Sequence, residues 1–212
     1  MSKTIIFDLD GTLTDSGEGI INCAIFALEH YGLPIPDRDT LRVFVGPPLR
    51  DSFYKFGVPA DQLEEAVRVY RSRYIPIGKF ENYPYEGIEN VLSALKEQGH
   101  HLYVATSKPE NMSIEILEHF GLAKYFDIIA GSAMDGVRDK KADVIAYLLE
   151  QIDDPGQPVM IGDTAFDVIG AAEHQIPTIG VTWGYGKKED MVAAGAVAIA
   201  ESMDQLLQLL SN

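Results

Sequence analysis

The sequence has one cysteine, few basic residues and no apolar run as long as a membrane span. A single cysteine, Cys23, excludes an intramolecular disulfide and a multi-cysteine metal site. The N-terminal stretch reaches the acidic Asp8 too early for a secretion signal. We therefore expect a soluble, cytoplasmic protein with no membrane partner.

Basic residues are outnumbered by acidic ones. Lysine and arginine total 17 against 32 aspartate and glutamate, which gives a net charge of −15. Such a surface repels nucleic acid at long range, so we expect no nucleic-acid partner. It also repels anionic substrates, and an enzyme that acts on them needs a local positive site, either a cation or a well-placed lysine. No exposed apolar helix is obvious, so we expect a monomer.

Hydrophobic residues make up 46% of the 212 residues, enough for a sizeable core in one domain or in one domain with a smaller insert. A short apolar run, a loop and an amphipathic helical pattern recur along the chain. The runs are typical of strands covered on both faces, and they lie at 4–7, 102–105, 128–130, 159–161, 178–181 and 197–199. This alternation predicts an α/β fold with a doubly wound, mostly parallel sheet.

One stretch, residues 15–82, interrupts the alternation. It carries helical patterns, for example Ile21, Ala24, Ile25 and Leu28 on one face, but no convincing core strand. We interpret it as a small all-helical domain inserted directly after the first strand. The remaining residues, 1–14 and 83–212, would form the sheet domain.

Polar side chains gather where the predicted strands end. In open parallel sheets, ligands bind beyond the carboxyl ends of the strands. The residues at these ends are Asp8 and Asp10 after the first strand, Thr106, Ser107 and Lys108 after the second, Lys140 and Lys141 in the loop after the third, and Asp163 and Asp167 after the fourth. We therefore expect these groups to converge on one edge of the sheet.

The chemistry of this set points to phosphate. Asp8, Asp10 and Asp163 cannot all ionise at close range without raising one another's pKa, unless a cation neutralises them. A set of oxygen ligands favours a hard ion, usually Mg²⁺ where a phosphate completes its shell. Hydroxyls, backbone N–H groups and a lysine suit phosphate oxygens. A carboxylate nucleophile, a second carboxylate two residues on and Mg²⁺ together form a phosphoryl-transfer site.

These residues resemble the four motifs of the haloacid dehalogenase superfamily, in the right order and over nearly the whole chain. The matching segments are 8–13 (DLDGTL), 106–107 (TS), Lys141 and 162–167 (GDTAFD). The helical insert is similar to that family's helical cap domain. The segments 8–16, 45–49 and Gly131-Ser132 through Asp135-Gly136 resemble the phosphoglycolate phosphatase and 5′-nucleotidase-like branch. The resemblance implies a Mg²⁺-dependent phosphomonoester hydrolase acting on a small phosphorylated metabolite such as phosphoglycolate or a nucleoside 5′-monophosphate.

The resemblance also implies a role for each motif. Asp8 would attack phosphorus and form an aspartyl-phosphate. Asp10 would protonate the leaving oxygen and then deprotonate the water that hydrolyses the intermediate. Thr106 would hold a phosphate oxygen, with help from the backbone at Leu9 and Ser107.

Positive charge would come from Mg²⁺ and lysine. The metal would lie between the Asp8 side chain, the Asp10 carbonyl oxygen and Asp163. Asp167 would lie nearby or bind through water, or else be a first-turn residue facing the helix dipole. Lys141 would offset charge on the nucleophile and on the transferred group. It is preferred to Lys140 because of the family's spacing from Arg138, and Lys108 could also approach the phosphate.

The loop 46–50 (GPPLR) of the insert has two interpretations. It is either a rigid helix connector or a cap loop that meets the substrate, with Arg50 contacting the end that does not react.

Three other activities use similar residues. A dehalogenase of the same superfamily does not need the second aspartate, so Asp10 argues against it. A sugar phosphomutase would share every core residue and stays open. A phosphorylation-switched receiver-type module combines similar groups on a doubly wound sheet, but it would be much shorter and would lack the helical insert.

Overall fold

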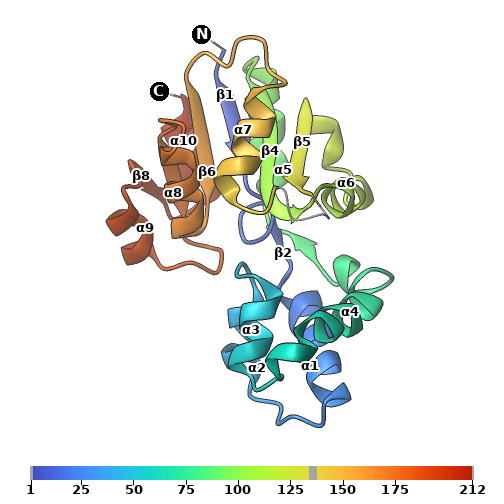
Figure 1. Ribbon diagram of the computed structural model, residues 1–212. Coiled ribbons are helices and arrows are strands. Elements are labelled where there is room, and N and C mark those ends of the chain that lie inside the picture. The colour runs from blue at the N-terminus through green and yellow to red at the C-terminus, as the bar shows by residue number, and fades with distance from the viewer. Residues whose placement is uncertain (1, 134–137, 212) are drawn as a thin grey trace. The chain divides into compact units, whose positions relative to one another are not determined.

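The computed structural model describes residues 2–133 and 138–211, and the chain divides into two units. Met1–Thr14 and Pro84–Asn212 form the sheet unit, and Asp15–Tyr83 form the helical unit (Figure 1). Tyr83, which the sequence places in the sheet domain, falls in the helical unit. Asp135 and Gly136, which contribute to the family resemblance, lie outside the described residues.

The sheet unit is built on parallel strands in the order β5-β4-β1-β6-β7-β8. Their bounds are β1 Thr4–Phe7, β4 His101–Pro109, β5 Ile128–Ser132, β6 Pro158–Gly162, β7 Thr178–Val181 and β8 Ala198–Ala200. β1 lies between β4 and β6, and all four of its residues are buried. The predicted doubly wound parallel sheet is therefore confirmed.

Helices cover both faces of this sheet (Figure 1). They are α5 Ile88–Glu97, α6 Glu110–His119, α7 Lys141–Leu149, α8 Ala165–Ala172, α9 Lys188–Ala194 and α10 Met203–Ser211, with a short turn η4 at Ala123–Tyr125. Successive side chains of a strand point to opposite faces. Ile5 and Phe7 accordingly pack in the cluster that contains residues of α5 and α10, and Ile6 packs in the cluster formed with α7 and α8.

Strand β4 is longer than the sequence indicates. The apolar run ends at Ala105, but the strand continues through Thr106, Ser107 and Lys108 to Pro109. Its pairing with β5 is irregular there, because Ala105 lies opposite Ala130 whereas Pro109 lies opposite Ser132. Extra residues on one strand bend it and re-aim its side chains. The predicted end of this strand is therefore wrong, and the irregular stretch carries the residues predicted to bind phosphate.

The helical unit contains α1 Gly17–His30, α2 Arg38–Leu41, α3 Leu49–Lys55 and α4 Leu63–Tyr74, with short turns η1 Arg42–Phe44, η2 Ala60–Gln62 and η3 Gly78–Phe80. An aromatic cluster forms part of its core: the Phe53 ring lies 5.0 Å from Phe44 and 6.3 Å from Tyr70, centroid to centroid. Two short strands, β2 Thr14–Asp15 and β3 Tyr83–Pro84, pair with each other where the chain passes between the units. Within the described residues, every helix is too short or too polar to cross a bilayer.

The single cysteine, Cys23, is packed inside the helical unit. Cys23 is fully buried in α1, and the Arg73 guanidinium donates a hydrogen bond to its Sγ at 3.2 Å. Arg73 also forms a two-point ion pair with Glu81. Gly78 is required beside it, since a Cβ there would overlap with Sγ.

His100 makes the stability of the sheet unit depend on pH. Its ring is buried, and Nδ1 accepts a hydrogen bond from the Lys3 backbone N–H at 3.1 Å. Burial, followed by the Lys3 charge, lowers the pKa of His100. The unfolded chain therefore binds more protons in acid than the folded chain. This contribution to the free energy of unfolding is present above about pH 6.5 and is lost as the pH falls through the lower, folded pKa.

We expect His100→Asn to lose less stability than the parent between about pH 7 and about pH 5.5 in urea unfolding, because asparagine does not take up a proton. His119, which is exposed in the same unit, supplies the control. His119→Asn should follow the parent. Equal pH dependence in the parent and His100→Asn would contradict the prediction.

Candidate active site

The first element of the site is the turn that follows β1. The Asp8 N–H continues the pairing with β6 by donating to the Ile161 carbonyl at 2.9 Å. The Leu9 carbonyl then accepts from the N–H groups of Leu13 at 2.9 Å and of Thr14 at 3.1 Å, while the Leu9 side chain is buried in the core. The main chain at Gly11 has a φ of +86°, which favours glycine. This tight turn holds Asp8 and Asp10 at the carboxyl end of the central strand.

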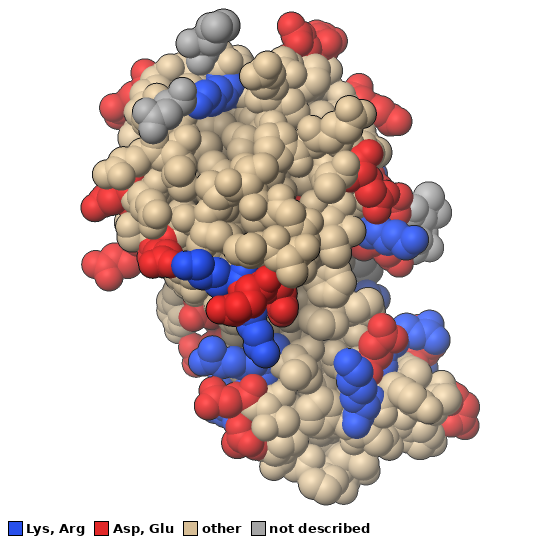
Figure 2. All heavy atoms as spheres, turned by 90° about the vertical axis from the view of Figure 1, so that its left-hand side faces the viewer, with Lys and Arg blue, Asp and Glu red and all other residues tan. Residues whose placement is uncertain are grey.

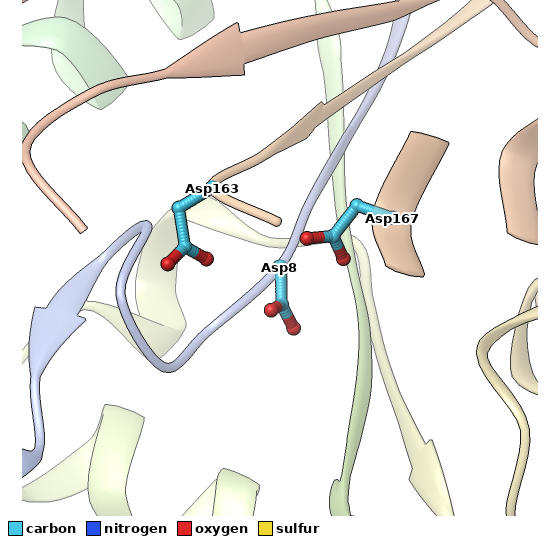
Figure 3. A group of neighbouring side chains, drawn as sticks. All are labelled: Asp8, Asp163 and Asp167. Atoms are coloured by element: carbon cyan, nitrogen blue, oxygen red, sulfur yellow. The ribbon is translucent and has the colours of Figure 1, made fainter. Parts of the chain in front are cut away.

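Three carboxylates meet at this edge of the sheet. One oxygen each from Asp8, Asp163 and Asp167 lies within 4.8 Å of the others, and all three side chains are buried (Figure 3). Asp163 directly follows β6, and Asp167 lies in the first turn of α8. The structure therefore brings together the ends of β1 and β6 as the sequence predicts.

Two buried lysines form ion pairs with Asp8, Asp10 and Asp167. The Lys141 ammonium lies 2.7 Å from Asp8 Oδ1 and 2.8 Å from Asp167 Oδ1, and it donates to the Ala105 carbonyl at 3.0 Å. The Lys108 ammonium lies 2.6 and 2.8 Å from the two oxygens of Asp10. The Asp10 carboxylate is therefore turned to Lys108, outside the cluster of Asp8, Asp163 and Asp167.

The remaining predicted residues are placed differently. The Thr106 hydroxyl oxygen is buried and accepts from the Lys108 N–H at 3.3 Å. Ser107 and Lys140 are exposed. Arg50 lies in the helical unit, where its exposed side chain pairs with Glu64 of α4.

The site carries more negative than positive charge. Burial raises the pKa of Asp8 to about 6, although Lys141 acts in the opposite direction. Burial, followed by the Asp167 and Asp8 carboxylates, raises the pKa of Asp163 to about 8. Burial alone would lower the pKa of Lys141, but Asp167 and Asp8 outweigh it and hold this pKa above its ordinary value. With all groups ionised, the four carboxylates and two lysines leave two negative charges.

A divalent cation fits this arrangement. The uncompensated charge is that of one such ion, the acidic cluster offers oxygen atoms alone, and hard cations prefer oxygen ligands. The residues present could therefore hold a divalent metal ion, and Mg²⁺ is the ion that the sequence indicates.

The exposed basic residues do not take the place of these buried lysines. Figure 2 shows that basic side chains lie among acidic ones on the face it presents, beside a broad uncharged area. Several exposed basic groups form ion pairs, among them Arg42–Asp39, Lys124–Glu89 and Lys188–Glu201. Exposed pairs of this kind offer little free positive charge to an anion. The buried lysines of the site are paired with carboxylates as well.

Several contacts at the site were not expected from the sequence. The Thr12 hydroxyl donates to Asp163 Oδ1 at 3.3 Å, and the Tyr185 N–H donates to Asp163 Oδ2 at 2.8 Å. Asp167 Oδ2 accepts from both the N–H and the hydroxyl of Thr164, which completes a capping box at the start of α8. The Thr-x-x-Asp spacing at 164–167 is a sequence signal for the capping box. The Tyr185 contact is made by a backbone N–H, so the residue type does not reveal it.

The sequence pattern described as haloacid dehalogenase-like hydrolase matches residues 5–181. A protein of Mycobacterium tuberculosis named tyrosine-protein kinase PtkA is 42% identical over 211 residues, 98% of this chain and 72% of that protein. A 5′-nucleotidase of Pseudomonas aeruginosa is 39% identical over 210 residues, 98% of this chain and 95% of that protein. The crystal structure of a predicted phosphatase from Clostridium acetobutylicum is 44% identical, with a TM-score of 0.92 and coverage of 100% of this chain and 99% of that one.

The charge imbalance predicts that Asp163→Asn stabilises the metal-free protein. Near neutral pH the folded chain must take up a proton at Asp163, because the pKa of this carboxyl is raised to about 8, whereas asparagine needs no proton. Asparagine also keeps the side-chain size and can still accept from Tyr185. We expect the free energy of unfolding in EDTA to rise by about 1–3 kcal/mol, measured by urea unfolding near neutral pH.

Added Mg²⁺ should stabilise the parent far more than Asp163→Asn. The exposed Asp153 provides the control, because Asp153→Asn should change stability by less than about 0.5 kcal/mol. A fall in metal-free stability on replacing Asp163 would show that the folded chain does not disfavour the ionised form of this carboxyl.

Proposed function

This chain belongs to the haloacid dehalogenase-like hydrolases and is a phosphatase of that family, and from that premise we propose that it is a Mg²⁺-dependent phosphomonoester hydrolase that works through an aspartyl-phosphate on Asp8. The observation that carries the proposal is the buried cluster of Asp8, Asp163 and Asp167 with the Lys141 ammonium 2.7 Å from Asp8. It combines a nucleophile, a place for a divalent ion and a fixed positive charge.

Asp8 and Asp10 divide the chemistry. An Asp8 oxygen attacks phosphorus while the bond from phosphorus to the leaving oxygen breaks, and protonated Asp10 gives that oxygen its proton. The Asp10 carboxylate then takes a proton from the water that attacks the aspartyl-phosphate. The bond from Asp8 to phosphorus breaks, and inorganic phosphate and the Asp8 carboxylate result.

Positive charge and donors hold the phosphate in place. Lys141 offsets charge on Asp8 and on the transferred group, and Lys108 approaches the phosphate from its position beside Asp10. Thr106 binds a phosphate oxygen, with the backbone N–H groups of Leu9 and Ser107 as further donors. The irregular pairing of β4 beyond Ala105 gives this strand a local geometry that a regular ladder would not allow.

The residues that would hold Mg²⁺ are the side chains of Asp8 and Asp163, with the Asp10 carbonyl oxygen and, through water, Asp167. The ion would supply positive charge that lets an anionic phosphate approach an anionic nucleophile. The acidic cluster alone would repel such a substrate.

The substrate class is a small phosphorylated metabolite. A nucleoside 5′-monophosphate is the first candidate, because the 39% identical relative named 5′-nucleotidase matches over nearly the full length of both chains. Phosphoglycolate is the second, on the motifs seen in the sequence. Both substrates present the same phosphate to the sheet unit, so any selectivity between them must come from contacts to the rest of the molecule.

A panel of phosphate esters tests the proposal. It should include nucleoside 5′-monophosphates, phosphoglycolate, hexose phosphates and p-nitrophenyl phosphate, each with Mg²⁺ and with EDTA. We expect release of inorganic phosphate with Mg²⁺ and none with EDTA. An isomerised sugar phosphate without phosphate release would instead identify a mutase. Because one relative is named a tyrosine kinase, a further arm offers ATP and a tyrosine peptide, and phosphotyrosine formation without ester hydrolysis would overturn the proposal.

We predict that Asp8→Asn abolishes turnover and leaves the fold intact. The change deletes the nucleophile and one charged metal ligand but keeps the side-chain size, so kcat should fall by about 10³-fold or more. Release of inorganic phosphate from p-nitrophenyl phosphate measures the loss, and circular dichroism checks the fold. The Asp153→Asn variant should turn over at the parent rate. Retained activity in Asp8→Asn would exclude an aspartyl-phosphate at this residue.

Arg50 provides a test of the helical unit. We propose that it contacts the end of the substrate that does not react, so Arg50→Ala should raise KM for the physiological ester by about tenfold and leave kcat for p-nitrophenyl phosphate unchanged. Arg68 is a matched control, since it is also exposed in the helical unit and paired with a glutamate, Glu65. Equal effects of Arg50→Ala and Arg68→Ala on KM would show that Arg50 forms only a surface ion pair and does not contact the substrate.

A further inference from the structure

The loop that follows β7 contacts two parts of the site at once. It contains Trp183-Gly184-Tyr185-Gly186. The Trp183 indole N–H donates to the Thr12 carbonyl at 3.1 Å, and the Tyr185 N–H donates to Asp163 Oδ2 at 2.8 Å. Since Thr12 belongs to the turn that carries Asp8 and Asp10, this loop joins the nucleophile turn to the end of β6.

These hydrogen bonds form a closed ring that includes the Asp163 carboxylate. Its Oδ1 accepts from the Thr12 hydroxyl, and the Thr12 carbonyl accepts from Trp183. Two residues beyond Trp183, the Tyr185 N–H returns to the other oxygen of Asp163. Each half of the carboxylate is thus held by a different segment, and Trp183 is a side chain that binds these segments to each other.

The glycines of this region allow the main chain to pack closely around Asp163, so these hydrogen-bonded segments have little space in which to move. A Cβ at Gly11 or Gly184 would overlap with the Asp163 carboxylate, and a Cβ at Gly186 would overlap with the Asp163 carbonyl. The main chains of both loops therefore pack directly against Asp163. A small displacement of the Trp183 loop would move the Tyr185 donor and change the position of this carboxylate.

The Trp183 ring is anchored on its other side. It is half-buried against the core cluster of the sheet unit, and it meets the Tyr85 ring edge to face with centroids 6.5 Å apart. The indole is thus held by packing and aimed by its N–H. A phenylalanine could fill much of the space but could not bind Thr12.

We propose that Trp183 is a positioning residue for the metal site: its indole N–H fixes the loop 183–186 against the turn 8–14 and thereby sets the position of Asp163 relative to Asp8. The inference rests on the proposed function, because it assumes that Asp8 and Asp163 share an ion. It assigns the indole no contact with substrate.

Because Trp183 is the only tryptophan of the chain, it can be replaced without altering any other residue. Expression in a tryptophan auxotroph supplied with benzothienylalanine substitutes sulfur for the indole N–H and keeps the shape of the ring. Incorporation of 4-fluorotryptophan, which retains the N–H, is the matched control. Both proteins and the parent are titrated with MgCl₂ alone in a calorimeter, and their turnover of p-nitrophenyl phosphate is measured over a range of Mg²⁺.

We expect benzothienylalanine to raise the dissociation constant for Mg²⁺ by about two- to tenfold. This is the change in affinity that the loss of a single hydrogen bond produces. At saturating Mg²⁺, kcat should fall and KM should stay constant, and the fluorotryptophan protein should match the parent. Equal Mg²⁺ binding and equal kcat with and without the N–H would overturn the inference and leave the proposed function intact. Failure of the parent itself to bind Mg²⁺ would instead defeat the proposed metal site.

Discussion

The site is governed by an excess of buried negative charge. Four carboxylates lie at the carboxyl ends of β1 and β6 or just beyond, and two buried lysines pair with three of them. Charges of one sign at this range are held together only when the fold is stable enough to oppose their repulsion. The central strand serves that purpose, because β1 is hydrogen-bonded to a strand on each side and Asp8 continues that pairing through its N–H. Loops alone could not hold the carboxylates so close.

Much of the site could be predicted from the sequence because parallel sheets obey a simple rule. The carboxyl ends of the strands lie at one edge, so residues that follow different apolar runs can be placed together before their contacts are known. This reasoning expects Asp8, Asp163 and Lys141 at one edge, and in the structure Asp8 lies in a cluster with Asp163 and pairs with Lys141. It works because each of these residues lies within a few positions of the end of a strand or at the start of a helix, where its location is limited by the backbone.

The rest depended on contacts that residue types do not encode. The sequence offers two lysines and several carboxylates but does not say which pair with which. The pairing of Lys108 with Asp10 and of Lys141 with Asp8 and Asp167 follows from where β4 bends and where α7 begins. The sequence does not reveal the extension of β4 beyond Ala105, because Thr106, Ser107 and Lys108 are polar and a buried strand is indicated by apolar residues. The Tyr185 contact is made by a main-chain N–H, which every residue but proline possesses.

Relatives of this chain carry names that describe different reactions. A protein named as a kinase and one named as a nucleotidase are each about 40% identical to the chain, and both names describe work on a phosphoryl group. In the proposed function, the acidic cluster and its lysines bind that group, whereas the choice of partner for the phosphoryl group requires contacts beyond them. The carboxylate cluster destabilises the fold when it is empty and is stabilised by a bound cation. Folding and ion binding are therefore coupled, since any ligand that binds only the folded state stabilises it. Thr12 and Trp183 are proposed to align the carboxylates without touching phosphate. Such residues would influence both the free energy of unfolding and the affinity of the site for a cation.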